Sequence, residues 1–474
     1  MKKIKIFMLA GLFLGTSSCT TNFEDINTNP NLIDQISPGT LLNEIIYNMA
    51  SNNLTNHYSI NCQLMQVQLS YPQYYGGIQR YEILETTGDS QWNAGYRWAK
   101  NIREMRAAAE AENSNNYLAI ALTLNAWVYT NLTDTFGDIP FSEASQAEDG
   151  LLQARYDKQE DIYQQLLSDL ATANSLYDHT QSMTYGTDIL FSNSTQKWQK
   201  FTNSLRLRLL LRIADVLPSA IDDMKTILGD PVNHPIITHA SESAILQVTG
   251  ITPNISPWSR ALDFSNQHAV GEFFIETLNN LNDPRRPIYV TPAAREGGSI
   301  GYKGIPSGYD DGSFDYSPSY MNNAQVVAPM IIPILTLAEV EFIQAELAQK
   351  GHITGDAETH FRKAIRAAVE LWTKVPLADA YFDQDLAQYD GTMERIMLHK
   401  YLALYFTDNQ QWAEYRRTGF PVLPSTSSML NDGVVPSRLM YASLQETYNA
   451  TNYKEAASRM DGDNVNAKVW WDIK

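Results

Sequence analysis

The stretch ILTLAEVEFIQAELAQKGHITGDAETHFRKAIRAAVELWT, residues 334–373, decides the fold that this sequence predicts. Its first part, 334–349, has the apolar spacing of an amphipathic helix, and Gly351 suits the left-handed conformation that closes many helices. The second part, 356–373, has the same spacing and predicts a second helix. Two helices joined by a short turn are the unit of helical-repeat scaffolds, so this stretch predicts one such pair.

Helical spacing continues along much of the chain. Residues 116–135 are one example, and Gly137 and Pro140 directly after them favour a helix cap followed by a turn. In each of these segments the apolar residues recur at three- and four-residue steps, which indicates helices that pack through one face. The other segments with this spacing are 41–49, 102–109, 161–176, 198–216 and 393–418.

The stretch from about 217 to 333 has a different composition. It is rich in Pro, Gly, Asn and Tyr, and its apolar runs are short, as at 244–248. We expect long loops, small strands and one helix near 270–281, and loops of this length in a compact protein are usually functional. The C-terminal stretch 421–474 is also rich in loops. The sequence therefore predicts a helical scaffold that carries a loop-rich insertion.

Composition and charge exclude several classes of function. The chain has 474 residues, of which 44% are hydrophobic, so it buries a large core. It has 53 acidic and 35 basic residues, an excess of 18 acidic groups, and no run of Lys or Arg. Nucleic acid is therefore not an expected partner, because phosphate binding needs clustered cations. Adsorption to anionic lipid through a basic patch is excluded for the same reason.

The N-terminus has the pattern of a signal peptide. Lys2, Lys3 and Lys5 precede an apolar stretch at 6–14 and small residues that end at Cys19, so we expect residues 1–18 to be removed. Cys19 then occupies the position of the acylated cysteine of a bacterial lipoprotein; the alternative is an ordinary cleavage site beside a cysteine. Polar residues 19–38 predict a tether, and 39–474 the folded domain. No later segment is apolar enough to span a bilayer.

Aromatic residues gather in two segments that lack a clean helical period. A sugar ring has an apolar face and an edge of hydroxyls, so its binding sites combine flat rings with hydrogen-bonding amides and acids. Gln68, Gln73, Gln79, Arg80 and Asn93 lie among the first group of rings and are candidates for the polar part. In the alternative interpretation, half or more of the rings only pack loops onto the scaffold. The ligand-binding candidates are Tyr71, Tyr74, Tyr75, Tyr81, Trp92 and Tyr96, then Trp258, Tyr302, Tyr309 and Tyr320, with Phe314 and Tyr316 among the last group.

Seven segments, in order along the chain, resemble the SusD/RagB family of nutrient-binding outer-membrane lipoproteins. The resemblance implies an all-α fold of tetratricopeptide-like helix pairs, with long loop-rich insertions and a few short strands. It also implies a SusC-like TonB-dependent transporter as partner and attachment to the outer membrane by the N-terminal lipid. Glu24 and Asp25 resemble the acidic signal that sends such lipoproteins to the cell exterior. The segments are NFEDINTNPN (22–31), DTFGDIPFSEA (134–144), WQKFTNSLRLRLLLRIAD (198–215), LNDPRRP (281–287), ILTLAEVEFIQAELAQKG (334–351), QQWAEYRRTGFP (410–421) and PSRLMYASLQETYNATNYKEA (436–456).

Signatures of catalysis and of cofactor binding are absent from the sequence. It contains no HExxH, G-x-S-x-G, P-loop or dinucleotide glycine motif, so we expect no enzyme, no cofactor and no metal. Glu339 and Glu346 share one helix face, where ion pairing is favoured over catalysis. The remaining polar groups are interpreted in the same way: Arg206, Arg208 and Arg212 as partners in ion pairs, His234 and His239 as surface residues, and Asp310, Asp311 and Asp315 as a hydrated turn in preference to a calcium site.

The predicted function is capture of an oligomeric nutrient at the outer membrane. A glycan is the favoured ligand, and an oligopeptide remains open. Two alternatives come from other classes: a secreted hydrolase that acts on the same material, and a helical-repeat adaptor that only braces an outer-membrane complex.

Overall fold

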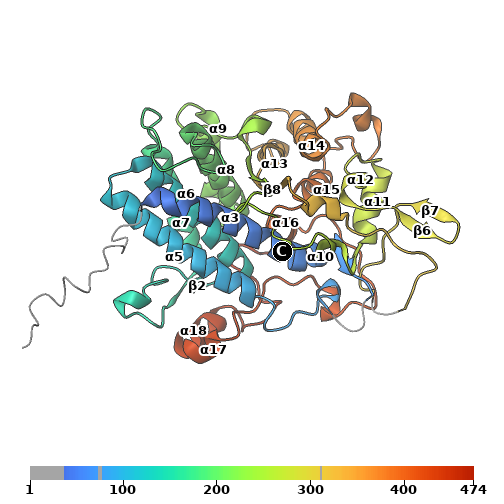
Figure 1. Ribbon diagram of the computed structural model, residues 1–474, viewed down its shortest axis with the longest axis horizontal. Coiled ribbons are helices and arrows are strands. Elements are labelled where there is room, and N and C mark those ends of the chain that lie inside the picture. The colour runs from blue at the N-terminus through green and yellow to red at the C-terminus, as the bar shows by residue number, and fades with distance from the viewer. Residues whose placement is uncertain (1–36, 73–76, 310–311) are drawn as a thin grey trace, which may run out of the picture. The chain divides into compact units, whose positions relative to one another are not determined.

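Helices dominate the computed structural model, which describes residues 37–72, 77–309 and 312–474 (Figure 1). The predicted signal peptide, Cys19 and nearly all of the predicted tether lie outside the described residues, as do Gln73, Tyr74, Tyr75, Asp310 and Asp311. In the described ranges, no helix combines the length and the apolar character needed to cross a membrane.

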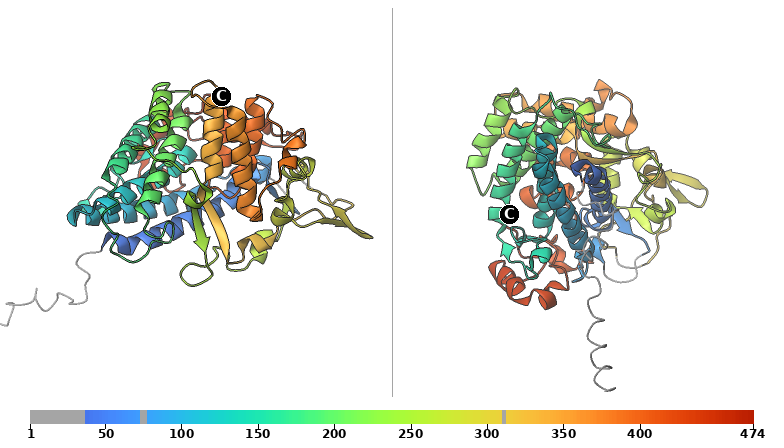
Figure 2. Two further views of the ribbon diagram at one scale, coloured as in Figure 1. Left: turned by 90° about the horizontal axis from the view of Figure 1, so that it is seen from above. Right: turned by 60° about the vertical axis from the view of Figure 1, so that its left-hand side comes forward.

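The helices form two groups in which consecutive helices pack on each other, which confirms the predicted all-α fold class. The two groups meet where α13 packs on α8, and Figure 2 shows both groups. The first group is α3 (Pro38–Asn56), α5 (Asp89–Ala111), α6 (Asn115–Phe136), α7 (Gln159–Leu176), α8 (Thr195–Ile213) and α9 (Ser219–Gly229); the second is α13 (Leu337–Gln349), α14 (Ala357–Thr373), α15 (Met393–Ala403) and α16 (Gln410–Thr418).

Side-chain caps set the start of the predicted helix pair at 334–373. The Thr336 hydroxyl accepts a hydrogen bond from the Glu339 backbone N–H, and the Asp356 carboxylate accepts one from Thr359 at 3.0 Å. Such caps satisfy backbone donors that have no partner within the helix. The predicted start at residue 334 is wrong, because Ile334 belongs to the strand that precedes α13.

The single helix predicted over 393–418 is also wrong. The chain breaks between α15 and α16, where Phe406 and Asp408 adopt positive φ angles of 66° and 27°. Neither residue is glycine or proline, so no helix-breaking residue marks the break in the sequence. At the end of α6, by contrast, Gly137 has φ 84°, as its position after residues 116–135 predicts.

Short two-stranded ribbons connect the helices, and most of them involve residues 244–335. The predicted apolar run 244–248 is a strand, and the helix predicted near 270–281 is α11 (Glu272–Asn280). The ribbon β6–β7 projects beside α11 and α12 (Figure 1). The antiparallel pairs are β1 (Gln68–Ser70) with β5 (His268–Val270), β2 (Ile139–Pro140) with β3 (Tyr156–Asp157), β4 (Ala244–Val248) with β8 (Met330–Leu335), and β6 (Ala293–Arg295) with β7 (Gly298–Gly301). Short helices are α4 (Cys62–Leu64), α10 (Leu262–Ser265), α12 (Arg286–Tyr289), α17 (Gln445–Tyr448) and α18 (Ala450–Arg459).

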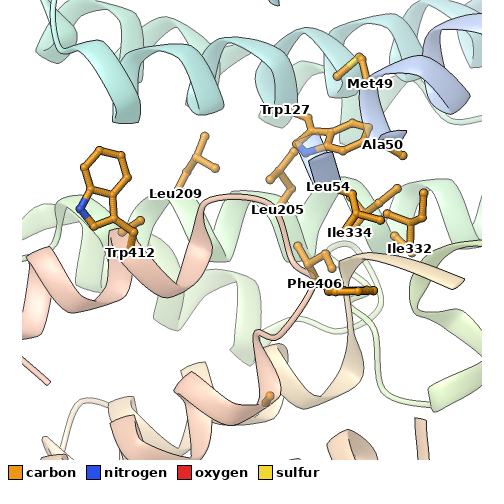
Figure 3. Packing of buried hydrophobic residues seen from close by; sticks show 14 of the residues in the cluster. Met49, Ala50, Leu54, Trp127, Leu205, Leu209, Ile332, Ile334, Phe406 and Trp412 are labelled. Atoms are coloured by element: carbon orange, nitrogen blue, oxygen red, sulfur yellow. The ribbon is translucent and has the colours of Figure 1, made fainter. Parts of the chain in front are cut away.

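The core lies between α3, α6, α8, β8 and the break between α15 and α16 (Figure 3). Trp127, Leu205 and Ile334 pack there from three different elements, together with Phe406 from the break between α15 and α16. Burying each large apolar side chain contributes about 1.5–3 kcal/mol. The Trp127 indole N–H donates to the carboxylate of Asp408 at 3.1 Å, so its polar atom is satisfied.

Ion pairs inside the core join helices from both groups. The buried Arg208 pairs with Glu339 at 2.6 Å, and the buried Arg212 pairs with Asp134 at 2.8 Å. The predicted ion pairs to neighbouring helices are thus confirmed for these two arginines. Arg206 makes no ion pair with any residue that the structure describes.

A second set of buried charges centres on Glu414. Its carboxylate accepts hydrogen bonds from Arg212, Lys400 and Arg417, and Arg417 also pairs with Glu346 at 2.6 Å. Burial alone raises the pKa of Glu346, but the adjacent Arg417 guanidinium outweighs this effect and lowers that pKa to about 2. Glu346 is therefore a structural anion, as the ion-pair interpretation of this glutamate predicts.

Candidate ligand-binding site

Three segments from distant parts of the chain form a small layer at one end of the helical scaffold. Strand β1 pairs with β5 so that Ser70 lies opposite His268. Residues 319–321 join the other edge of β5, because Val270 donates to the Ser319 carbonyl at 2.9 Å and Met321 donates to that of His268 at 3.1 Å. The layer therefore places residues 70–71 and residues 319–321 on the two sides of β5.

Two glycines allow the close approach of these segments. A Cβ atom at Gly271 would lie 2.1 Å from the carbonyl oxygen of Gln66, and one at Gly304 would lie 2.7 Å from that of Val270. Both contacts are with backbone, so no side chain can move aside to relieve them. Only glycine permits this packing, which fixes the position of the layer.

The buried amide of Gln66 ties the layer to the loops around it. Its nitrogen donates to the Tyr81 hydroxyl and to the Pro424 carbonyl, both at 2.9 Å, and its oxygen accepts from the Ser307 hydroxyl at 2.6 Å. One side chain thus connects four segments that are far apart in sequence. Because a fully bonded buried amide is costly to disrupt, it stabilises one arrangement of the loops.

Two other glutamines that we expected to contact ligand have the same structural role. Gln68 is buried and donates to the Tyr58 carbonyl at 2.8 Å, and Gln79 is buried and donates to the Tyr309 carbonyl at 3.1 Å. The prediction of ligand contact is wrong for both amides, because both side chains are fully buried.

Five rings from two distant stretches form an aromatic cluster, which consists of Tyr71, Tyr309, Phe314, Tyr316 and Tyr320. The centre of the Tyr71 ring lies 5.5 Å from that of Tyr309, 5.8 Å from Phe314 and 6.4 Å from Tyr320. The Phe314 and Tyr316 rings are 5.1 Å apart. These separations are typical of favourable aromatic pairs. Tyr309 is buried, whereas the other four rings are half-buried and keep part of their surface exposed.

A cleft of about 480 Å³ opens beside this cluster, and we call it the tyrosine cleft. Tyr71 and Tyr320 supply its rings, and Asn266, Gln267 and Asn323 supply side-chain amides. Within the described part of the chain, none of these three amides has a hydrogen-bond partner. The cleft therefore combines aromatic surface with free donors and acceptors.

The described lining of the tyrosine cleft is uncharged. None of the described side chains that line it carries a charge. Burial raises the pKa of Tyr320, so its phenol stays protonated at neutral pH and both donates and accepts hydrogen bonds. Thr291 adds a hydroxyl group, which is 3.3 Å from both the carbonyl oxygen and the nitrogen of Tyr320.

Two of the predicted ligand-binding rings lie in the core. Trp92 is 4% exposed, and its ring packs 4.9 Å from that of Tyr96 and 5.1 Å from that of Phe136. Tyr81 is 2% exposed, and its hydroxyl is bonded to Gln66. The prediction of ligand contact is therefore wrong for Trp92 and Tyr81. The helix α5 extends to Asp89, which turns Trp92 toward the core, and the sequence does not reveal this early start.

Two further candidates use their side chains in contacts within the protein. Tyr96 is half-buried, and its hydroxyl donates to the Pro140 carbonyl at 2.7 Å. The guanidinium of Arg286 lies 4.8 Å from the centre of the Tyr302 ring, in a cation–π contact. Neither residue lines the tyrosine cleft.

Trp258 lies beside a different cleft, of about 570 Å³, which we call the tryptophan cleft. Its half-buried ring packs edge-on against Tyr58 at 5.7 Å and Phe264 at 5.2 Å. His268 lines the same cleft. The structure thus places three of the predicted rings at clefts. Tyr71 and Tyr320 line the tyrosine cleft, and Trp258 lines the tryptophan cleft.

A third hollow, of about 510 Å³, lies between α5, α6, α7 and residues 141–146. Its two arginines already have anionic partners: Arg103 pairs with Asp149 at 3.1 Å and Arg106 with Glu110 at 2.9 Å. The rings at this hollow are the buried Tyr129 and the half-buried Phe141. Because its arginines are already paired, this hollow offers a ligand fewer unpaired polar groups than the tyrosine cleft does.

Metal binding has little support among the described residues. They contain no group of three or more His, Cys, Asp or Glu side chains that is able to hold a metal ion. Asp315, which we considered with Asp310 and Asp311 as a calcium site, pairs with Arg295 at 2.7 Å. The other two aspartates lie outside the described residues, as do the predicted ligand-binding residues Tyr74 and Tyr75.

Sequence reasoning missed the polar residues of the tyrosine cleft. Asn266 and Gln267 lie in the turn that enters β5, whereas Thr291 comes from another loop and Asn323 begins a short 3-10 helix. Each is an ordinary polar residue, and no local motif distinguishes it. The pairing of β5 with its two neighbours brings them together.

Comparisons with known proteins agree with the fold. A family model described as "Starch-binding associating with outer membrane" matches residues 30–442. Similar solved structures include a chitin-binding protein with 23% identity, which covers 92% of this chain and 100% of its own at a TM-score of 0.78. A Bacteroidetes SusD-like protein has 22% identity, covers 93% of this chain and 100% of its own, and gives a TM-score of 0.79. A SusD homolog from Bacteroides uniformis has 23% identity, covers 92% of this chain and 99% of its own, and gives a TM-score of 0.78. No curated protein sequence matches.

Proposed function

The chain belongs to the SusD-like family, and from this premise we propose that it binds a neutral oligosaccharide in the tyrosine cleft. The observation that carries the proposal is the chemistry of that cleft. Tyr71 and Tyr320 present ring surface to the apolar face of a sugar, and the free amides of Gln267, Asn266 and Asn323 lie within the same cleft for its hydroxyls.

The neutrality of the cleft favours a glycan over a peptide. Peptides carry charged termini and frequently charged side chains, and the described lining offers no ion-pair partner for them. The family description names starch, and one structural relative is named a chitin-binding protein. Both polymers are chains of neutral sugars, in agreement with the chemistry of the cleft.

The proposal includes a place at the outer membrane. Cys19 carries the lipid that anchors the mature chain, the folded domain faces the cell exterior, and a SusC-like TonB-dependent transporter receives the ligand. The family description, which names association with the outer membrane, supports this arrangement. The cysteine's position after a signal-like leader supports the anchor.

The role that we propose is binding without catalysis. The carboxylate pair that the sequence presents on α13 is occupied, because Glu339 pairs with Arg208 and Glu346 with Arg417. Both carboxylates are buried, so neither is placed to act on a glycan. A measured turnover of oligosaccharide by the purified protein would favour the hydrolase alternative.

Isothermal titration calorimetry of the mature domain against maltooligosaccharides, chitooligosaccharides and oligopeptides tests the proposal. We expect an oligosaccharide to bind and Tyr71→Ala to weaken that binding by about tenfold, in line with the loss of one aromatic contact. Tyr448→Ala is the matched control, because Tyr448 is 66% exposed on α17 and lies apart from both clefts.

Three results would contradict the proposal. Binding of peptides alone would replace the glycan by the oligopeptide alternative. Absence of any binding at millimolar concentration would favour the structural adaptor. Equal affinity of the wild type and the Tyr71→Ala variant would place the ligand elsewhere.

A further inference from the structure

One short segment, Leu262–His268, separates the tyrosine cleft from the tryptophan cleft. Leu262 and Gln267 line the first cleft, whereas the residues that follow each of them, Asp263 and His268, line the second. Leu262 and Asp263 belong to the short helix α10, whereas Gln267 lies in the turn before β5, with a positive φ of 61°, and His268 is the first residue of that strand. The two clefts are therefore the two sides of one thin divide.

The two clefts meet where β1 pairs with β5. Ser70 of β1 lies opposite His268, and the next residue, Tyr71, donates its backbone N–H to the Gln267 carbonyl at 2.9 Å. From strand geometry, the Cα atoms of Tyr71 and His268 are within about 7 Å of each other. Tyr71, whose ring lines the tyrosine cleft, is thus a neighbour of His268, whose imidazole lines the tryptophan cleft.

The tryptophan cleft has the same kind of chemistry as the tyrosine cleft. Trp258 supplies a half-buried ring, and Asn56 and Ser90 supply an amide and a hydroxyl that have no hydrogen-bond partner in the described part of the chain. The carboxylate of Asp263 is already paired with Arg260 at 2.6 Å. The cleft therefore offers aromatic surface and neutral polar groups.

His268 supplies an acceptor to this cleft. Its Nδ1 atom lies 3.1 Å from the Phe264 carbonyl, which requires a proton on Nδ1. Burial lowers the pKa of His268, so the imidazole is neutral at pH 7 and Nε2 is unprotonated. Among the described residues, Nε2 has no partner, which leaves it free to accept a hydrogen bond from a ligand hydroxyl.

We infer that the two clefts are consecutive subsites of one extended site, and that a neutral oligosaccharide chain passes over the divide, beside Tyr71 and His268, to fill both. This inference rests on the function proposed above for the tyrosine cleft. It predicts selection by chain length. A short oligosaccharide occupies the tyrosine cleft alone, and a longer one gains the contacts of Trp258 and His268.

Titration with a length series tests the inference, using maltooligosaccharides and chitooligosaccharides from disaccharide to octasaccharide. In the wild type, affinity rises with length until both clefts are filled. Trp258→Ala abolishes this rise, which lowers the affinity for the longest chains by about tenfold and leaves that for the disaccharide unchanged. Tyr71→Ala weakens binding at every length, and Tyr448→Ala changes nothing.

A second variant keeps the test valid if Trp258→Ala fails to fold. Ser90 is exposed at the start of α5 and lines the tryptophan cleft, so Ser90→Trp fills that cleft without removing a core contact. We expect the same loss for long chains only. If both variants bind long chains as tightly as the wild type while Tyr71→Ala still weakens binding, the extended site is refuted and the tyrosine cleft stands. If no oligosaccharide binds the wild type at any length, the proposed function fails and this inference fails with it.

Discussion

Replacing Trp92 by alanine distinguishes a core ring from a binding ring. The side chain is 4% exposed, and besides Tyr96 and Phe136 its ring lies 5.9 Å from Tyr441 and 6.1 Å from Tyr156. Truncation removes the ring from all four neighbours and leaves a cavity among them. Changes of this kind in protein cores cost about 3–5 kcal/mol, so we expect Trp92→Ala to lower the free energy of unfolding by that amount.

Urea unfolding followed by circular dichroism measures this loss, and calorimetric titration of the folded variant measures ligand affinity. We expect a lower urea midpoint and an unchanged oligosaccharide affinity, because Trp92 lines neither the tyrosine cleft nor the tryptophan cleft. Tyr448→Ala is the control for stability, since substitutions at exposed sites usually change it by less than about 0.5 kcal/mol. A variant that keeps its urea midpoint but loses affinity would refute the placement of Trp92 in the core.

Two further predictions concern the buried charges. Glu346→Gln leaves Arg417 without one of its two buried carboxylate partners, so we expect the free energy of unfolding, measured with urea, to fall by about 3–5 kcal/mol. The control is Asp222→Asn, which breaks an exposed ion pair and should change this free energy very little. Similar losses in the two variants would contradict the structural role of Glu346. Burial lowers the pKa of His57 and of His399 from 6.5 to about 4, so the unfolded chain binds more protons than the folded chain between these pH values. The stabilisation that comes from keeping these two histidines neutral is therefore fully present above pH 6.5. It is lost as the pH drops toward 4, by about 3 kcal/mol for each imidazole. His399→Gln should remove about half of this loss in urea midpoints measured from pH 7 to pH 4, and an unchanged pH dependence would show that the imidazole is not responsible.

The helical scaffold was predictable because its signals are local. Apolar spacing and the glycine at 137 mark α6, and the same spacing marks the pair α13 and α14. The prediction failed where a change of backbone direction has no sequence signal, as at Phe406 between α15 and α16. Periodicity continues across that break, so the sequence alone reads as one helix.

The binding site was predictable only in its residue types. Tyr71, Tyr320 and Trp258 lie at clefts, as rings in irregular segments suggested, whereas Trp92 and Tyr81 do not. The difference is set by contacts between distant segments. For example, the carbonyl of Gln66 packs against Gly271, and this contact fixes which rings meet. No pattern within either segment encodes such a contact, and so the amides of the tyrosine cleft were missed altogether.

A crystal structure of the mature domain with a bound maltooligosaccharide or chitooligosaccharide tests the central claim most directly. We predict a sugar ring in contact with Tyr71 and Tyr320, with its hydroxyls bonded to the amides of Gln267 or Asn323. Sugar density located only in the hollow between α5 and α6, with the tyrosine cleft empty, would contradict the account.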